Sequence, residues 1–532
     1  MWTARHVGRR CTQKARVAET VRFSCATWRQ NTRWASTASP EFEHSGDKAD
    51  DHLPCLQKGG FNRSIFVKEV HACAEQIQKK QKVEECYDLH GNLGTGAFGS
   101  VCLACHRASG HEVAVKSIPK QAVQESDPNL ETLWREVKLL KLTDHPNVAR
   151  LYEAHEDDTH VHLVMEYCSG GELWKRILSA HESGLGFGEA ELADAARQMI
   201  RAVAYVHGQS IVHRDIKPEN FLYASEAKDS QLKLVDFGIC GIVPSDCPDM
   251  RFLTATVGTD GYMAPEILLS KPYGPAADMF SLGAVLHSAI VGMPPRWVPE
   301  KQAYTFPGRM RWRTLSKEAQ SLLADLLHED PSARPSAMEA MQHPWLTRCN
   351  ETCGILNATV CSELTQRLQS FGQRSKLERA ARFALVALSR LRSEEMTELQ
   401  AAFIEADVDC SGECTKDELL SALQLRSVNG ARPELESFFS SLDCSKSGLI
   451  SYTEFLAAAA SKAWVSDNKE ARQAFDSLDA DGDGFLTIDE IISAFPGVYA
   501  EEELEQEMKR WDSNGDGQLS FEEFCGLLSE QV

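Results

Sequence analysis

Four aspartates, each heading a turn-rich acidic segment, recur at nearly constant intervals near the end of the chain. Asp407, Asp443, Asp479 and Asp512 are separated by 36, 36 and 33 residues. A period of this length is typical of repeated supersecondary units that bury their apolar faces against one another. Phenylalanines flank the segments at positions 403, 439, 455, 475 and 524. We therefore expect an all-α module over residues 395–532.

Oxygen-bearing residues within these segments predict calcium loops of the EF-hand type. Such a loop has 12 residues: positions 1, 3, 5 and 12 offer side-chain oxygens, position 7 offers a backbone carbonyl, and position 6 is glycine. The expected ligands of the first, third and fourth loops are Asp407, Asp409, Ser411, Glu413 and Glu418; Asp479, Asp481, Asp483, Phe485 and Glu490; and Asp512, Asn514, Asp516, Gln518 and Glu523.

The second loop is a weaker candidate. Its expected ligands are Asp443, Ser445, Ser447 and Glu454, so that only the two terminal carboxylates remain. Calcium affinity depends on the number of charged ligands. We therefore expect this loop to bind calcium less tightly than the other three.

The net charge of −21 is concentrated in the same module. Residues 395–532 contain 9 basic and 30 acidic residues, and the rest of the chain is balanced. Such acidity argues against a nucleic-acid partner and for bound cations or a basic peptide. Residues 363–392, with seven basic and two acidic residues, are expected to form a basic amphipathic helix. An EF-hand groove binds helices of this kind; a plain spacer helix is the alternative.

An ordered series of motifs occupies the preceding region. A glycine-rich hairpin, whose backbone amides can approach a phosphate closely, contains Gly94, Gly96, Gly99 and Val101. Lys116 then ends V-A-V-K in a predicted strand, and Glu136 follows in a predicted helix. The series continues with H-R-D-I-K-P-E-N at 213–220, D-F-G at 236–238 and A-P-E at 264–266.

In order, identity and spacing these motifs resemble those of the eukaryotic protein kinases, over residues 87–345. The resemblance implies that Lys116 holds the α and β phosphates of ATP and that Glu136 orients Lys116. It also implies that Asp215 positions the substrate hydroxyl, that Lys217 reaches the γ phosphate, and that Asp236 and Asn220 bind magnesium. Glu166 and Cys168 fall at the adenine-contacting hinge, and Asp278 and Arg334 at positions that stabilise the larger lobe.

Two features of this region bear on substrates and regulation. Glu172 and Glu219 resemble positions that pair with an arginine upstream of the target residue, so we expect Ser/Thr targets with an upstream Arg. Ala255 occupies the place where many kinases carry an activating phosphate, although Thr254 and Thr256 flank it. Arg214 therefore has no required phosphate partner, which indicates regulation by another device.

The whole arrangement resembles the calcium-dependent protein kinases of plants and alveolate protists, from about residue 60 to the end. It implies an α+β bilobal kinase fold at 87–345, an autoinhibitory junction at 346–394 and an all-α calmodulin-like domain of four EF-hands at 395–532. In that family the EF-hands grip the junction when calcium binds and so release the kinase cleft. We expect ATP, Mg²⁺ and Ca²⁺ as cofactors and an intramolecular contact between the EF-hands and the junction.

The remaining residues, 1–86, form an N-terminal extension. Its first 40 residues contain eight Arg or Lys and the single acid Glu19. Such composition is typical of a disordered basic tail and also of organelle transit segments. Seventeen scattered cysteines favour a reducing compartment, and no apolar run reaches the length of a membrane helix. We expect a cytoplasmic protein, with organelle import as the alternative.

The sequence thus predicts a calcium-activated Ser/Thr protein kinase that acts in signal transduction. Two other interpretations stay open. The chain could be a calcium-responsive scaffold whose kinase fold is silent, although Lys116, Asp215 and Asp236 are all present. It could also be a kinase switched by separate calmodulin or by phosphorylation at Thr254 or Thr256.

Overall fold

The computed structural model describes residues 78–529 apart from short gaps, the longest of which are 125–132, 243–252, 348–357 and 424–437. The extension up to residue 77, Glu136 of the predicted lysine pair and Ser445 of the second predicted loop lie outside the described residues.

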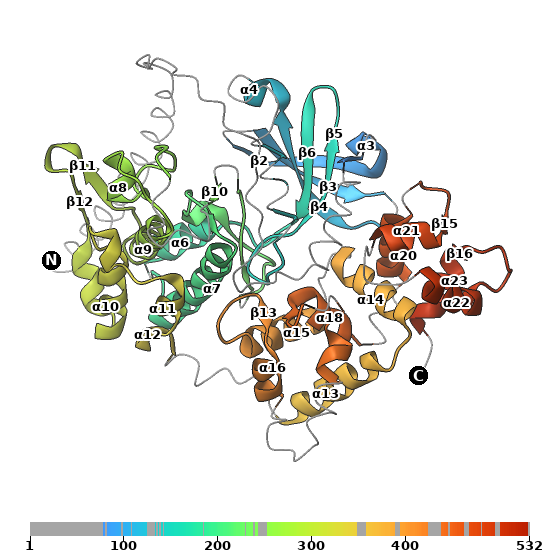
Figure 1. Ribbon diagram of the computed structural model, residues 1–532. Coiled ribbons are helices and arrows are strands. Elements are labelled where there is room, and N and C mark those ends of the chain that lie inside the picture. The colour runs from blue at the N-terminus through green and yellow to red at the C-terminus, as the bar shows by residue number, and fades with distance from the viewer. Residues whose placement is uncertain are drawn as a thin grey trace, which may run out of the picture. The chain divides into compact units, whose positions relative to one another are not determined.

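The first lobe is built on one twisted sheet with the strand order β1-β5-β6-β4-β3-β2 (Figure 1). β1 runs parallel to β5, and the other neighbours are antiparallel. Alternating apolar residues such as Val113 and Val115 pack with Tyr87 on one face of the sheet. Its elements are β1 (Gln78–Lys79), α3 (Val83–Cys86), β2 (Tyr87–Gly96), β3 (Gly99–His106), β4 (Glu112–Pro119), α4 (Lys120–Gln124), β5 (Leu151–Glu156) and β6 (His160–Glu166).

The second lobe is mainly helical, and its core is formed by α7 (Glu189–Gly208) and α9 (Ala276–Val291). α9 is apolar around almost its whole circumference, which accounts for its position inside the lobe. The other helices are α6 (Leu173–Glu182), α8 (Pro265–Leu268), α10 (Lys317–Leu326), α11 (Ala337–Met341) and α12 (Pro344–Thr347). Short strand pairs join β7 (Ile211–Val212) to β10 (Gly241–Ile242), β8 (Phe221–Tyr223) to β9 (Leu232–Leu234), and β11 (Arg296–Val298) to β12 (Ala303–Thr305).

The junction consists of two helices rather than the single helix expected over residues 363–392. α13 (Ala358–Gly372) ends at a glycine, and α14 (Lys376–Leu388) begins after Ser375, whose hydroxyl accepts the N–H of Glu378 at 3.2 Å. The Glu507 carboxylate accepts the N–H groups of Lys376 and Leu377 at 3.2 and 2.7 Å. A carboxylate from elsewhere in the chain therefore accepts the first backbone N–H groups of α14. Two helices are stable for this reason where the sequence favours one.

The last part of the chain contains two pairs of helix–loop–helix units. The first pair has α15 (Glu394–Ala406), β13 (Glu413–Cys414), α16 (Lys416–Ala422), β14 (Ile450–Ser451) and α18 (Tyr452–Ala459). The second has α20 (Asn468–Leu478), β15 (Phe485–Leu486), α21 (Ile488–Ala494), α22 (Glu501–Trp511), β16 (Leu519–Ser520) and α23 (Phe521–Ser529). Antiparallel bridges β13–β14 and β15–β16 couple the two loops of each pair.

The two-lobed α+β fold followed by a helical EF-hand module confirms the predicted fold class. Among the described helices, none is long and apolar enough to cross a membrane.

Candidate active site and calcium sites

The glycine-rich hairpin lies between β2 and β3, where Gly94 pairs with Val101 and Gly96 with Gly99. A Cβ atom at Gly99 would lie 2.1 Å from the carbonyl oxygen of Ser117, so the neighbouring strand requires glycine there. A Cβ at Gly94 would meet no atom within 4 Å. Packing therefore explains Gly99, whereas the bare backbone at Gly94 leaves room for a ligand such as a phosphate group.

Lys116 lies in β4 opposite Val101 and points its ammonium group at Asp236. The distance from Nζ to Oδ1 of Asp236 is 2.8 Å, and the lysine side chain is nearly buried. Burial by itself raises the pKa of Asp236, but the neighbouring Lys116 outweighs it and the pKa lies below its usual value. The pair places one fixed positive charge beside a carboxylate that stays ionised.

Asp215, Lys217 and Asn220 come together on the loop between β7 and β8. Nζ of Lys217 lies 2.5 Å from Oδ2 of Asp215, and the Asn220 amide donates to the Asp215 backbone carbonyl at 2.8 Å. A fourth member, Thr259, is not indicated by any sequence motif. Its hydroxyl donates to Oδ1 of Asp215 at 2.5 Å and accepts from Lys217 at 3.0 Å. Several threonines occur in that segment, so the sequence alone does not single out this one.

Asp278 anchors the backbone of the same loop from α9. Its two carboxylate oxygens accept the N–H groups of His213 and Arg214, both at 2.8 Å. Arg214 has a φ of 68°, and Asp236 one of 63°, in the left-handed region that non-glycine residues avoid. Burial acts to raise the pKa of Asp278, but hydrogen bonding to His207 keeps the pKa below its usual value. A buried, ionised aspartate thus holds strained backbone in place next to Asp215.

Of the predicted hinge residues, Glu166 is the last residue of β6 and Cys168 follows the strand. The Glu166 carboxylate is engaged with Nζ of Lys233 at 3.1 Å and with the N–H of Arg150 at 3.3 Å. Cys168 is 6% exposed. The Glu166 side chain therefore serves to fix the hinge to the larger lobe through Lys233, and its backbone N–H already donates to the carbonyl of Arg150 at 2.9 Å.

Glu219 and Glu172 face one region beside the catalytic loop. Oε2 of Glu219 is buried without a hydrogen-bond partner among the described residues, and Glu172 pairs with Lys175 at 2.9 Å. Burial raises the pKa of Glu219, Lys217 opposes this effect, and the charge on Glu172 reinforces it. A buried carboxylate oxygen is stable when a cationic donor reaches it, so this region is suited to a guanidinium group.

The first and third calcium loops present converging carboxylates. Oxygens of Asp407, Asp409 and Glu418 lie within 4.8 Å of one another, and so do those of Asp479, Asp481 and Asp483. Burial and the neighbouring carboxylates raise the pKa of Asp407 to about 7. A divalent cation bound by oxygen ligands would relieve this repulsion, so the donor set fits Ca²⁺. Ser411 donates its hydroxyl to the carbonyl of Glu413, and Glu490 accepts from Thr487 at 2.8 Å.

The second and fourth loops have the same backbone turn. Asp443 accepts the N–H groups of Ser447 and Gly448 at 2.9 and 2.8 Å, and Glu454 is 1% exposed. In the fourth loop Asp512 accepts from Gly517 at 2.8 Å. The other predicted ligands there also have local contacts: Asn514 donates to Asp516 at 2.7 Å, Gln518 donates its N–H to Asp516 at 2.9 Å, and Glu523 accepts from Ser513 at 2.7 Å.

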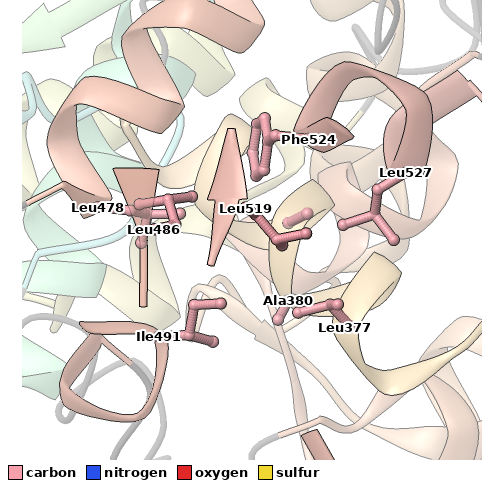
Figure 2. A pocket seen from close by; sticks show the side chains of 9 residues that line it. Leu377, Ala380, Leu478, Leu486, Ile491, Leu519, Phe524 and Leu527 are labelled. Carbon is pink, nitrogen blue, oxygen red and sulfur yellow. The ribbon is translucent and has the colours of Figure 1, made fainter. Parts of the chain in front are cut away.

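Helix α14 packs against both EF-hand pairs, through α18 of the first and through α20, α22 and α23 of the second. Figure 2 shows the apolar pocket between α14 and the second pair. Residues of both line it: Leu377, Ala380, Ala381, Leu478, Leu486, Ile491, Leu519, Phe524 and Leu527. Arginines of the junction meet backbone carbonyls, as Arg379 does at Ser441, 3.2 Å away. Apolar contacts, backbone carbonyls and, at its first turn, the Glu507 carboxylate hold this helix.

The first EF-hand pair also contacts the kinase lobes. Thr453, at the start of α18, donates its N–H and its hydroxyl to the Asp144 carboxylate at 2.9 and 2.8 Å. Arg150 donates to that hydroxyl at 3.0 Å and to the carbonyl of Val386 in α14 at 3.0 Å. Nothing in the sequence pattern indicated Asp144 or Arg150. Both lie more than 200 residues from their partners in the sequence, and motif spacing does not predict contacts over such separations.

Comparison with known proteins agrees with this geometry. The protein kinase domain family matches residues 87–346, and the EF-hand domain pair matches residues 396–460 and 468–529. Calcium-dependent protein kinase 24 of Oryza sativa subsp. japonica is 36% identical over 356 residues, which cover 65% of this chain and 66% of the relative. Calcium-dependent protein kinase 9 of the same species is 36% identical over 362 residues, with 66% and 60% covered. Calcium-dependent protein kinase SK5 of Glycine max is 34% identical over 361 residues, with 65% and 67% covered.

The fold, the ordered motifs and the two family matches define a protein kinase domain joined to an EF-hand module. The matched region spans about two thirds or less of the length of the first two relatives. The chain belongs to the calcium-dependent protein kinase family.

Proposed function

We propose that the protein is a calcium-activated serine/threonine kinase that transfers the γ-phosphoryl group of ATP to protein hydroxyl groups in signal transduction. Asp215 would accept the hydrogen bond of the attacking hydroxyl, and Lys217 would stabilise charge on the transferred group. Lys116 would hold the α and β phosphates, beneath the glycine-rich hairpin. Phosphoryl transfer requires mainly positioning and charge neutralisation, which these fixed charges supply.

Asp236 and Asn220 would hold Mg²⁺. The oxygen donors of the two residues suit this cation, which would neutralise charge on the phosphates. Glu136 would orient Lys116, as the family resemblance implies. Gly94, Gly96, Gly99 and Val101 would cover the nucleotide, and backbone groups from Glu166 to Cys168 would contact the adenine.

The observation that carries calcium regulation is the position of α14 against both EF-hand pairs. We infer that calcium at the four loops stabilises this arrangement and keeps the junction, residues 346–394, away from the kinase cleft. Without calcium the junction would be released from the EF-hands and would inhibit residues 87–345. A ligand shifts such an equilibrium only by its differential affinity for the two states, and the carboxylate clusters of the loops supply that difference.

A preference for an upstream arginine is supported by Glu219 and Glu172. Oε2 of Glu219 has no hydrogen-bond partner within the part of the chain that the structure describes, and together with the charge on Glu172 it favours a bidentate cation over a neutral side chain. We expect an Arg-x-x-Ser peptide to be a better substrate than a peptide in which alanine replaces the arginine. The variant Glu219→Gln should reduce this difference between the two peptides.

The decisive experiment is phosphorylation of an Arg-x-x-Ser peptide by the full chain, with calcium and with a calcium chelator, beside an Asp236→Ala control. Activity that requires both calcium and Asp236 supports the proposal. Activity that is indifferent to calcium contradicts inhibition by the junction. Absence of activity in every condition, with several basic peptides, favours a scaffold whose kinase fold is silent.

For the compartment we propose the cytoplasm, with organelle import through the Arg-rich extension, residues 1–86, as the competing interpretation. The free cysteines of the described residues, among them buried Cys410 and Cys414, favour a reducing environment. Fusing residues 1–86 to a fluorescent protein would distinguish the two: diffuse fluorescence supports the cytoplasm, and fluorescence confined to an organelle supports import.

A further inference from the structure

The segment between α9 and α10, residues 292–316, presents a positively charged surface that the catalytic scheme does not use. It contains five basic residues and a single acidic one, Glu300. The basic residues are all exposed: Arg296, Lys301, Arg309, Arg311 and Arg313. Within the described part of the chain none of them forms an ion pair with a carboxylate; Arg311, for example, donates to the carbonyl of Val291 at 3.2 Å. Their charge is therefore available to a partner from outside the chain.

An aromatic framework holds this surface in place. The ring centroids of Trp297 in β11 and Tyr304 in β12 lie 5.2 Å apart. Phe306 continues the series, 6.4 Å from Tyr304 and 5.9 Å from Trp312. The Tyr304 hydroxyl donates to the carbonyl of Met263 at 2.7 Å. Ring pairs of this kind stabilise a structure by more than the area that they bury, so the basic residues extend from a well-defined backbone.

The surface adjoins the segment that reaches the predicted catalytic aspartate. Thr259 donates its hydroxyl to Asp215 at 2.5 Å. Two residues further on, a Cβ atom at Gly261 would lie 3.3 Å from the carbonyl oxygen of Pro295, the residue that precedes Arg296. About six residues of an extended peptide, at roughly 3.3 Å each, span this path from Asp215 to Arg296. A substrate whose hydroxyl group lies at Asp215 can therefore reach the surface with the same stretch of chain.

We propose that residues 292–316 form a second substrate-recognition surface, which binds an acidic segment about six residues C-terminal to the phosphorylated Ser or Thr. Exposed guanidinium groups bind carboxylates in a bidentate manner. Met310, which is 66% exposed and lies between two of the arginines, adds an apolar contact. The upstream side of the substrate is assigned to Glu172 and Glu219, so acidic residues belong on the downstream side. Proximity to Asp215 favours a peptide over an anionic membrane as the partner.

The test uses the full chain at saturating calcium with three extended peptides. Each contains Arg-x-x-Ser, a neutral spacer of five residues and a run of four aspartates, four asparagines or four lysines. We expect kcat/KM for the aspartate peptide to exceed that for the asparagine peptide by roughly 3–10-fold, because each exposed ion pair contributes little and several act together. High salt should remove this difference, since it screens exposed charges.

A binding measurement separates this inference from the proposed kinase activity on which it rests. The unextended Arg-x-x-Ser peptide tests the kinase activity alone. Fluorescence anisotropy of the three extended peptides, with alanine in place of the serine, measures binding without catalysis. Tighter binding of the aspartate peptide than of the asparagine peptide supports the surface even if no peptide is phosphorylated, and equal binding contradicts it.

Charge reversal tests the residues of the surface. Arg296→Glu and Arg309→Glu should each bring the ratio of kcat/KM between the aspartate and asparagine peptides close to one. Both variants should instead favour the lysine peptide, a reversal that a merely structural role would not produce. Lys228→Glu is the matched control, because Lys228 is an exposed cation on the turn between β8 and β9. That variant should keep the ratio of the wild type.

Three results would overturn the inference. The first is equal kcat/KM of the wild type for the aspartate and asparagine peptides, and the second is an equal fall of the ratio in Arg296→Glu and Lys228→Glu. The third is sedimentation of the wild type with phosphatidylserine vesicles, lost in Arg296→Glu, without any preference for the aspartate peptide. That outcome would assign the surface to an anionic membrane.

Discussion

Thr259 shares its hydroxyl between Asp215, to which it donates at 2.5 Å, and Lys217, from which it accepts at 3.0 Å. The hydroxyl therefore fixes the two side chains relative to each other. We expect Thr259→Ala to lower kcat/KM by roughly 10–100-fold, because it removes hydrogen bonds to two charged groups. Thr259→Ser keeps the hydroxyl and should retain most activity. Steady-state kinetics on both variants checks this, and equal losses in the two would contradict the assigned role.

The calcium loops differ in the ligands that they offer, and we expect their glutamates to differ in importance. Glu490→Gln and Glu523→Gln should each shift the calcium concentration for half-maximal activity upward, since a bidentate carboxylate at position 12 is lost. Glu454→Gln should have a smaller effect, because its loop has serines at positions 3 and 5. Calcium titrations of the three variants make the comparison. A larger shift for Glu454→Gln would reverse the proposed order of the sites.

Asp144 links a kinase loop to helix α18 through both hydrogen bonds from Thr453. Asp144→Asn should weaken this contact, since an amide cannot accept from both groups and from Arg150 as the carboxylate does. We expect a loss of about 1–3 kcal/mol in the stability of the contact. Hydrogen exchange at the start of α18 would measure it at saturating calcium. Thr453→Val, which removes the hydroxyl donor and keeps the backbone N–H donor, provides the comparison. Unaltered hydrogen exchange in both variants would show that the contact contributes nothing to stability.

A buried ion pair between Glu266 and Arg334 secures the larger lobe. The guanidinium donates to both carboxylate oxygens at 2.7 and 2.8 Å, and the Arg334 side chain is 0% exposed. Arg334→Met should destabilise the kinase domain by roughly 3–5 kcal/mol, because it leaves Glu266 buried without its partner. Chemical unfolding of the full chain tests this value. The double variant Arg334→Met/Glu266→Met should recover part of the loss.

His287 is expected to contribute to acid sensitivity. It is fully buried, and its Nδ1 accepts from the indole of Trp312 at 3.0 Å. Burial, aided by Arg309, lowers its pKa from 6.5 to about 4. Since the folded state keeps the ring neutral, stability is full above pH 6.5 and falls as the pH drops towards 4, by up to roughly 1.4 kcal/mol per pH unit.

His287→Gln keeps an acceptor for Trp312 but does not titrate. The slope of stability against pH between 6.5 and 4 should therefore be smaller in this variant than in wild type. His328→Gln, at an exposed position, serves as the control. An unchanged slope in His287→Gln would mean that other groups cause the acid sensitivity.

Much of the fold followed from local patterns. The strand expected at V-A-V-K, which ends at Lys116, lies within β4, and the expected glycine-rich hairpin joins β2 to β3. These segments have strong periodicity, and neighbouring parts of the chain reinforce it. The junction differed because the start of its second helix depends on the Glu507 carboxylate, which lies 131 residues from Lys376.

Contacts between residues far apart in sequence also limit what can be predicted of the candidate site. The ordered motifs located Asp215, Lys217, Asn220 and Asp236, since chemistry fixes both their identity and their order. Thr259 is an ordinary residue in sequence, and only the folded chain brings its hydroxyl group to Asp215. The Lys116–Asp236 pair was not anticipated either; the sequence suggested Glu136, which lies outside the described residues.

Helix α14 is held by both EF-hand pairs at once, and this arrangement has a consequence for timing. A segment bound at two linked sites dissociates only when both contacts are open together, since each contact keeps the other at high effective concentration. Calcium leaving one pair would therefore not free the helix. The bound position of α14 would therefore outlast a calcium pulse for a short time. The EF-hand pair that releases calcium more slowly would set the length of this delay.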